Sequence, residues 1–257
     1  MPRIARQRSE SGIYHIMLRG ANRQAIFHDD EDCLRYLETL DRYKKQSELK
    51  VHGWCLMGNH VHLLLGEGKE EISVTMKRIG VSFAWYYNWK YKTIGHLFQD
   101  RYRSENVDSD EYLMAVVRYI HQNPVKAGLV KRADEWKWSS CIGYYGKQYY
   151  LPMLLDSELI LSKFSEDKDI SIKRFIEYNE QENEDKFLDD RLRTRLTDEE
   201  ARDEIIKLIQ GYEISQIKSL PKQQRDALLV KIKEIEGLSQ RQAARILGIS
   251  PNLLFKL

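Results

Sequence analysis

Residues 51–65 read VHGWCLMGNHVHLLL, two short apolar runs separated by Gly-Asn at positions 58–59. Both of these residue types tolerate a positive φ, so the pair predicts a two-residue turn between antiparallel strands. Side chains two residues apart on a strand point to the same face. His60 and His62 therefore leave one face of the predicted hairpin together, while the apolar residues that alternate with them form a buried stripe on the other face.

The segments around this hairpin have strand or helix periodicity. Strands are expected at 14–18 and 96–107, and helices at 29–49, 73–91 and 110–122. This order of elements predicts an α+β fold, a ferredoxin-like or RRM-like antiparallel sheet with the helices on one face. The last of these helices should stop near Pro124, because a proline disfavours helical backbone in the residue before it.

Charge and aromatic content divide the 257 residues into three blocks. Residues 1–150 carry a net charge of +5 and 21 of the 27 aromatic residues, residues 151–190 a net charge of −7, and residues 191–257 a net charge of +4. We therefore expect a first domain over 1–150, an acidic helical connector over 151–195 and a helical C-terminal region over 196–257. A basic, aromatic surface suits single-stranded nucleic acid, although the same rings could simply form the core.

Several classes of protein are disfavoured by the composition. No apolar run approaches the roughly 18 residues of a membrane-spanning helix, and the first residues contain no hydrophobic signal region, so a cytoplasmic protein is expected. Cys33, Cys55 and Cys141 are far apart and form no Cys-x-x-Cys pair. This spacing favours reduced core thiols over a disulfide framework or a thiolate zinc site.

Two interpretations of the histidine pair stay open on the residues alone. The imidazoles are half of a metal site or an acid-base pair, or they are ordinary structural histidines. On the helix expected at 110–122, Tyr119 and Asn123 are one turn apart on one face. An amide at this spacing could hold a metal ion near the phenol for attack on a phosphodiester. Equally, Asn123 could end the helix and Tyr119 could be an aromatic residue at the edge of the core.

Three separated motifs, in order, identify a resemblance. They are MGNHVHLL at 57–64, LFQDRY at 97–102, and RYIHQNPVKAGLV at 118–130 with the following WSS at 138–140. Together they resemble the HUH-type single-tyrosine transposases of the IS200-like superfamily, and among them the REP-associated tyrosine transposases. The resemblance covers about residues 1–150, which would then be the catalytic domain.

The resemblance implies a set of roles. His60, His62 and Asn123 would bind one divalent cation, Mg²⁺ or Mn²⁺, although these donors do not themselves select the metal. Tyr119 would be the nucleophile, leaving a 5′-phosphotyrosine and a free 3′-OH, so that strands can be cut and joined in DNA transposition. Tyr112 is the rival nucleophile, but it lies about three turns from Asn123 rather than one.

The implied substrate is single-stranded DNA, beside a hairpin of a repetitive extragenic element with a short guide sequence. The candidate phosphate contacts are Arg19, Arg23, Arg101, Arg103 and Lys126. A monomer is favoured over a dimer. Two other functions remain as alternatives: a DNA-binding regulator that keeps the fold without cutting, and a metal-dependent RNA-processing enzyme on a similar sheet.

Residues 238–250, LSQRQAARILGIS, resemble the first helix and turn of a helix-turn-helix. Ser239 would cap the helix and Gly248 would make the turn, with Arg241 and Arg245 as candidate DNA contacts. About seven residues follow, fewer than in most recognition helices. The alternative is a small helical bundle that docks on the first domain.

Overall fold

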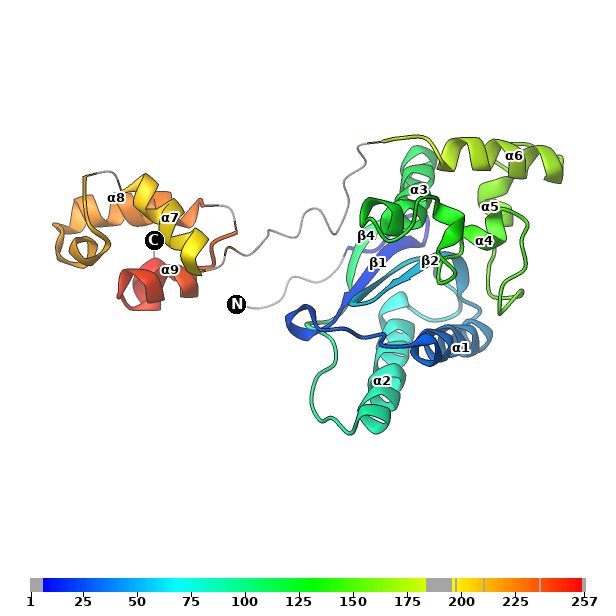
Figure 1. The fold of residues 1–257 in the computed structure, drawn as a ribbon, viewed down its shortest axis with the longest axis horizontal. Helices are drawn as coiled ribbons and strands as arrows, with labels where there is room; N and C mark the ends of the chain where they lie inside the picture. Colours follow the sequence, from blue (N-terminus) through cyan, green and yellow to red (C-terminus); the bar gives the residue numbers. More distant parts are fainter. Residues whose placement is uncertain (1–6, 184–195, 197, 210, 236, 256–257) are drawn as a thin grey trace. The chain divides into compact units, whose positions relative to one another are not determined.

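The chain forms two compact units, Met1–Asp189 and Asp190–Leu257, which Figure 1 shows. The computed structural model describes residues 7–183, 196, 198–209, 211–235 and 237–255. Among these residues, no helix combines the length and the apolar character needed to cross a membrane. The first unit contains the sheet, and the second is built from helices.

The first unit is built on a four-stranded antiparallel sheet with the strand order β2-β3-β1-β4. Its strands are β1 Ile13–Arg19, β2 Lys50–Met57, β3 His60–Gly66 and β4 Arg103–Asn106. This arrangement confirms the predicted α+β class and the ferredoxin-like sheet. The strand expected at 96–107 is much shorter, because the residues before Arg103 form a loop that meets β1 through the isolated bridge between Gly20 and Phe98.

The hairpin at the centre of the sequence is present. Met57 pairs with His60 across a two-residue turn at 58–59. Neither turn residue has a positive φ, so the turn is not of the positive-φ type that glycine and asparagine favour. The turn carbonyls accept hydrogen bonds instead: Gly58 O accepts from Ile26 N at 2.8 Å, and the carbonyl of residue 59 accepts from the amide of residue 20 at 2.9 Å. These bonds tie the loop after β1 to the start of β3.

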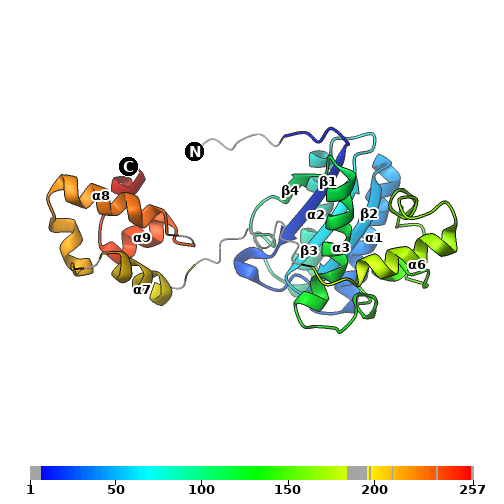
Figure 2. The ribbon, with the colours of Figure 1, turned by 90° about the horizontal axis from the view of Figure 1, so that it is seen from above.

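Helices cover both faces of the sheet, which corrects the prediction of helices on one face. In Figure 1, α1 (Asp30–Ser47) and α2 (Ile72–Tyr91) lie on one side of the strands, and α3 (Asp110–Lys126) lies on the other. The reason is that the central strands carry buried apolar side chains in both directions. Leu63 packs in the core with α1 and α2, whereas Leu64 packs in the core with α3. Figure 2 shows α3 running across this second face.

Helix α3 continues through Pro124 to Lys126, beyond the predicted end. At its start, the side chain of Ser109 accepts a hydrogen bond from the backbone N–H of Tyr112 at 3.2 Å. The proline lies in the last turn, and the backbone N–H of Ala127 still bonds to the carbonyl of Asn123 at 3.0 Å. Asn123 is therefore an interior residue of the helix and does not end it.

The segment expected to be a connector contributes to the first unit. After the short helices η1 Ala21–Arg23, η2 Ala133–Glu135 and α4 Cys141–Tyr144 come α5 Glu158–Leu161 and α6 Lys168–Asn179. Phe175 of α6 is fully buried and stacks on Tyr144, with 4.6 Å between ring centroids. Its aromatic packing makes 158–179 part of the domain core rather than a spacer, and residues 184–195 of the expected connector lie outside the described residues.

The second unit is a small helical bundle with its own buried apolar core. Its elements are α7 Asp198–Leu208, η3 Ile214–Ser219, α8 Lys222–Lys233, α9 Gln240–Leu247 and α10 Pro251–Phe255. Ser239 caps α9 by accepting a hydrogen bond from the Gln242 N–H at 3.1 Å, as expected. Gly248 ends the helix with a φ of 64°, a conformation that favours glycine.

Candidate functional site

The candidate site lies between β3 and α3. His60 and His62 are both buried and leave the sheet towards α3, with 5.1 Å between their ring centroids. From α3, the ring of Tyr119 meets His62 edge to face, with 5.5 Å between centroids and an interplanar angle of 89°. The fold therefore brings together three of the side chains singled out in the sequence, two from a strand and one from a helix.

A third histidine, which sequence reasoning missed, completes this cluster. His15 of β1 is fully buried, and its Nε2 lies 3.2 Å from Nδ1 of His62. Its ring centroid is 5.9 Å from that of Tyr119. The register of β1 against β3 pairs His15 with Leu64, which puts His15 on the α3 face. The alternation of residues 14–18 indicates a strand, but it does not say which face of the sheet His15 occupies. The pairing of β1 with β3 decides that face.

Burial sets the protonation of the central histidine. His62 is fully buried, and this burial, together with His60, His15 and Arg19 nearby, lowers its pKa well below the ordinary value. The ring is therefore neutral at physiological pH, which is the form that binds metal ions. Its Nε2 is buried and has no hydrogen-bond partner among the residues that the structure describes.

In His60, as in His62, the Nε2 atom is the one available to a ligand. Its Nδ1 lies 2.6 Å from the side-chain oxygen of Asn59, an acceptor, so Nδ1 carries the proton. A neutral imidazole has one N–H, and Nε2 of His60 is therefore the nitrogen able to coordinate a cation. In both histidines, Nδ1 contacts a protein group and Nε2 is the candidate ligand atom.

The residues that the sequence predicts as metal ligands combine two imidazoles with one amide. Within the described ranges, no three His, Cys, Asp or Glu side chains form a metal-binding group, so the two histidines need a ligand of another type. Asn123 is buried on α3, one turn after Tyr119. Two neutral imidazoles and an amide oxygen suit several divalent ions, so these residues are chemically adequate without selecting one.

The two tyrosines of α3 have different surroundings. The hydroxyl of Tyr112 donates a hydrogen bond to Glu105 Oε2 at 2.6 Å, and this oxygen is 3.9 Å from Nδ1 of His15. Tyr119, by contrast, packs its ring against His15 and His62. Tyr119 is thus the tyrosine in ring contact with a candidate metal ligand.

Three of the five predicted cations of the first unit lie on the face of the histidines. Arg19 pairs with His60 across β1 and β3, and Arg103 pairs with Met17, the neighbour of His62 in the sheet. The ammonium of Lys126 lies 5.5 Å from the centroid of the Tyr119 ring. The remaining two, Arg23 and Arg101, are exposed in the loops that follow β1 and precede β4.

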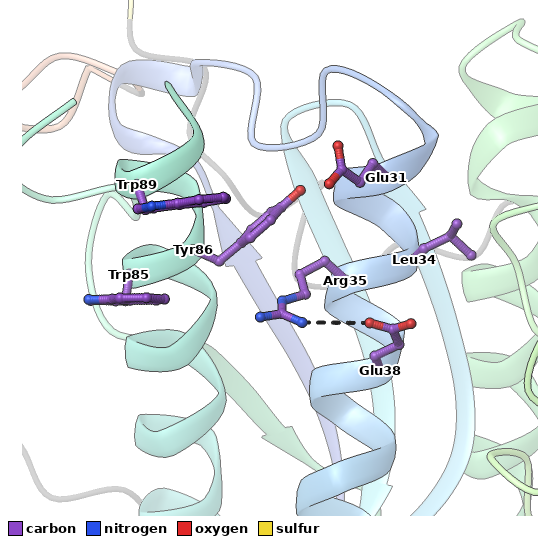
Figure 3. Close-up of a pocket in the computed structure, with 7 residues that line it drawn as sticks. All are labelled: Glu31, Leu34, Arg35, Glu38, Trp85, Tyr86 and Trp89. Atoms are coloured by element: carbon purple, nitrogen blue, oxygen red, sulfur yellow. Dashed lines mark ion pairs between the residues drawn. The ribbon is translucent and has the colours of Figure 1, made fainter. Parts of the chain in front are cut away.

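The most exposed tryptophans lie away from this site. Trp85 and Trp89 are 67% and 69% exposed on α2, on the other side of the sheet. Figure 3 shows them one turn apart beside Tyr86, where they line a cleft of about 490 Å³ whose other side, on α1, contains the ion pair between Arg35 and Glu38. Neither face of the sheet is an open stacking platform, because helices cover both.

In the second unit, the two predicted arginines differ. Arg241 is exposed near the start of α9. Arg245 is also exposed, but its guanidinium forms a two-oxygen ion pair with Asp198, at 2.6 and 2.8 Å. Arg245 therefore links α9 to the first turn of α7 in the bundle.

Comparisons with known proteins agree with the motifs. Residues 9–123 match the family model described as IS200-like transposase. A REP-associated tyrosine transposase of Escherichia coli (strain K12) is 25% identical over 101 residues, which are 38% of this chain and 58% of that protein. A solved structure described as a REP-associated tyrosine transposase bound to a REP hairpin is similar with a TM-score of 0.49 and 19% identity, over 59% of this chain and 90% of that one. The match thus spans a little over half the length of the curated relative.

Proposed function

Because residues 9–123 match the family model of IS200-like transposases, we propose that the chain cuts and rejoins single-stranded DNA with Tyr119 as the nucleophile. The observation that carries the proposal is the contact between the Tyr119 ring and His62, which joins a phenol and a buried neutral imidazole across two layers of the fold. The first unit, with residues 1–150 at its centre, is the catalytic part.

The metal ligands in this proposal are Nε2 of His60, Nε2 of His62 and the amide oxygen of Asn123. Burial keeps His62 neutral. The hydrogen bond to Asn59 keeps the proton of His60 on Nδ1, so Nε2 of His60 is unprotonated and can also bind the metal ion. These residues would hold Mg²⁺ or Mn²⁺, and the bound ion would supply positive charge to polarise the scissile phosphate. The proposal needs no cysteine ligand, and all three thiols are buried in the core.

In the covalent step, the phosphate of the cleaved bond is transferred from the 3′-oxygen of the DNA to Tyr119. The phenol oxygen of Tyr119 loses its proton and forms a bond to phosphorus, while the bond from phosphorus to the 3′-oxygen of the preceding nucleotide breaks. That oxygen takes up a proton and leaves as a free 3′-OH, and the downstream strand stays attached as a 5′-phosphotyrosine. Attack by a 3′-OH on the same phosphorus reverses the step and joins strands. The charge of Lys126, 5.5 Å from the Tyr119 ring, favours the negative phenol oxygen.

The proposed substrate is single-stranded DNA beside a hairpin of a repetitive extragenic element. The name of the curated relative supports this choice. Arg19, Arg103 and Lys126 border the histidine face and are the proposed phosphate contacts there, and Arg23 and Arg101 would extend the contact along the adjoining loops. We propose a monomer as the acting form.

The test uses end-labelled single-stranded oligonucleotides from the DNA around the gene that encodes this chain, with and without Mn²⁺. A labelled band at the protein's position on a denaturing gel, present with metal and absent in Tyr119→Phe, is the expected result. The variant of the rival nucleophile, Tyr112→Phe, should still form the band at saturating Mn²⁺, because it retains Tyr119. Tight binding without a band would favour the regulator, and metal-dependent cleavage of RNA without a protein-linked product would favour the RNA-processing enzyme.

For the second unit we propose a DNA contact through α9 and the turn at Gly248. Arg241 is the side chain that carries it, because it is exposed, while Arg245 is paired with Asp198. Arg241→Ala should weaken DNA binding in a mobility-shift assay without changing the melting temperature. An unchanged affinity would favour a bundle with another role.

A further inference from the structure

We propose that His15 is a positioning residue that holds His62 in the tautomer needed for metal binding. The inference rests on the proposed role of His62 as a ligand. Nothing in the sequence motifs assigns a role to His15, and no metal contact is required of it. Its effect would act through one hydrogen bond to the neighbouring strand.

The geometry leaves one hydrogen bond between the two rings. Nε2 of His15 lies 3.2 Å from Nδ1 of His62, and both side chains are fully buried. One nitrogen must donate and the other must accept. If Nδ1 of His62 donates, its Nε2 carries no proton and can coordinate a cation. If instead His15 donates, the neutral His62 ring carries its proton on Nε2, and that nitrogen is blocked.

The carboxylate behind His15 selects between the two directions. Glu105 pairs with His15 across β1 and β4, and its Oε2 lies 3.9 Å from Nδ1 of His15. This separation is too long for a hydrogen bond, but a negative oxygen on this side electrostatically favours a proton on Nδ1 of His15, and Nε2 of the same neutral ring is then the acceptor. His62 must then donate from Nδ1. The buried Nε2 of His62, which has no hydrogen-bond partner in the described residues, is left as the ligand atom.

Tyr112 fixes the outer end of this chain of contacts. Its hydroxyl donates to Glu105 Oε2 at 2.6 Å. The order Tyr112, Glu105, His15, His62 therefore runs from α3 across two strands to the proposed metal ligand. Tyr112, the rival nucleophile, would therefore have a positioning role in the site and would not need to attack DNA.

The first test is a Mn²⁺ titration of the full chain, with free Mn²⁺ measured by electron paramagnetic resonance. His15→Leu fills a similar volume but cannot accept a hydrogen bond, and it should raise the dissociation constant by about 10- to 100-fold, as for other residues behind metal ligands. His15→Gln retains an acceptor and should recover most of the affinity. His52→Gln, at a buried histidine bonded to the carbonyl of Asp156, is the control and should bind like the wild type.

The second test uses the unmodified chain and so does not depend on how the variants fold. Long-range ¹H–¹⁵N spectra of histidine-labelled protein report which nitrogen carries the proton. The inference expects the proton on Nδ1 in both His15 and His62. A proton on Nε2 of His62, or equal Mn²⁺ affinity in His15→Leu and wild type, would overturn it.

These outcomes separate the inference from the proposed function. If the wild type binds Mn²⁺ and forms the covalent band while His15→Leu binds equally well, the positioning role is wrong and the transposase function stands. If the wild type binds no Mn²⁺, both the metal site and the role of His15 are wrong. A weakened His15→Leu with a restored His15→Gln supports both.

Discussion

The ring of Tyr119 stands perpendicular to the ring of His62, with 5.5 Å between their centroids. The tyrosine comes from α3 and the histidine from β3, so the contact joins a helix to the face of the sheet that it covers. Any change that shifts α3 relative to the sheet would separate the proposed nucleophile from the proposed metal ligand. Residues that hold α3 in place are therefore expected to affect activity as well as stability.

His60→Ala should abolish metal-dependent cleavage and leave the fold intact. The substitution removes one of the proposed ligands, while the buried apolar stripe on the other face of β3 is unchanged. The measurement is single-turnover cleavage of a hairpin oligonucleotide across a range of Mn²⁺ concentrations, with circular dichroism to check the fold. Wild-type activity in this variant would remove His60 from the metal site.

Arg103→Ala should weaken single-stranded DNA binding in a way that depends on salt. Arg103 is exposed on the histidine face, and losing one phosphate contact should reduce the slope of log K against log salt by about 0.7 for a single strand. The control is Lys69→Ala, an exposed lysine beyond the opposite end of β3 that pairs with Glu48. Equal slopes in the two variants would argue against a contact at Arg103.

Asn179→Ala should lower the free energy of unfolding of the first unit by about 1–3 kcal/mol, because it leaves buried partners without their hydrogen bonds. The side chain of Asn179 is fully buried, contacts Nδ1 of His121 at 3.2 Å, and donates to the Tyr145 hydroxyl at 2.9 Å. Gln181→Ala, at an exposed side chain just after α6, is the control. Urea denaturation with matched slopes measures the difference, and an unchanged midpoint would show that α6 does not stabilise α3.

The stability of the first unit should fall as pH is lowered from about 7 towards 4. Burial lowers the pKa of His121 from 6.5 to about 3, so between these values the unfolded chain binds a proton that the folded chain does not. The free energy of unfolding is then lost by up to about 1.4 kcal/mol per pH unit for this group. His121→Gln should flatten the dependence, and His96→Gln, at an exposed histidine, should not. Parallel curves for the wild type and His121→Gln would contradict this assignment.

Much of the fold could be predicted because its signals are local. The hairpin at 51–65 combines a turn pair with alternating residues, and the structure has the same two strands with a two-residue turn at the same position, although the turn residues do not have the positive φ that their types favour. The exit of His60 and His62 on one face follows from the same alternation. The helices at 29–49 and 73–91 were also expected within a few residues of where they occur.

What could not be predicted depends on pairing between distant segments. His15 enters the site through the register of β1 against β3, which residues 14–18 do not specify alone. The two-sided cover of the sheet requires α3 to cross to the face opposite α1 and α2. Similarly, the acidic composition of 151–190 suggests a connector and gives no sign that α6 packs on the first unit. The packing depends on the buried ring of Phe175, which stacks on Tyr144.

The most direct measurement is the site of the covalent bond. The chain would be reacted with a hairpin oligonucleotide and Mn²⁺, digested with nuclease and trypsin, and examined by mass spectrometry. Cleavage after Arg118 places Tyr119 and Tyr112 in different peptides, so the modified residue is read directly. We expect a nucleotide phosphate on the peptide that begins at Tyr119. A phosphate on the Tyr112 peptide, or cleaved DNA with neither peptide modified, would contradict it.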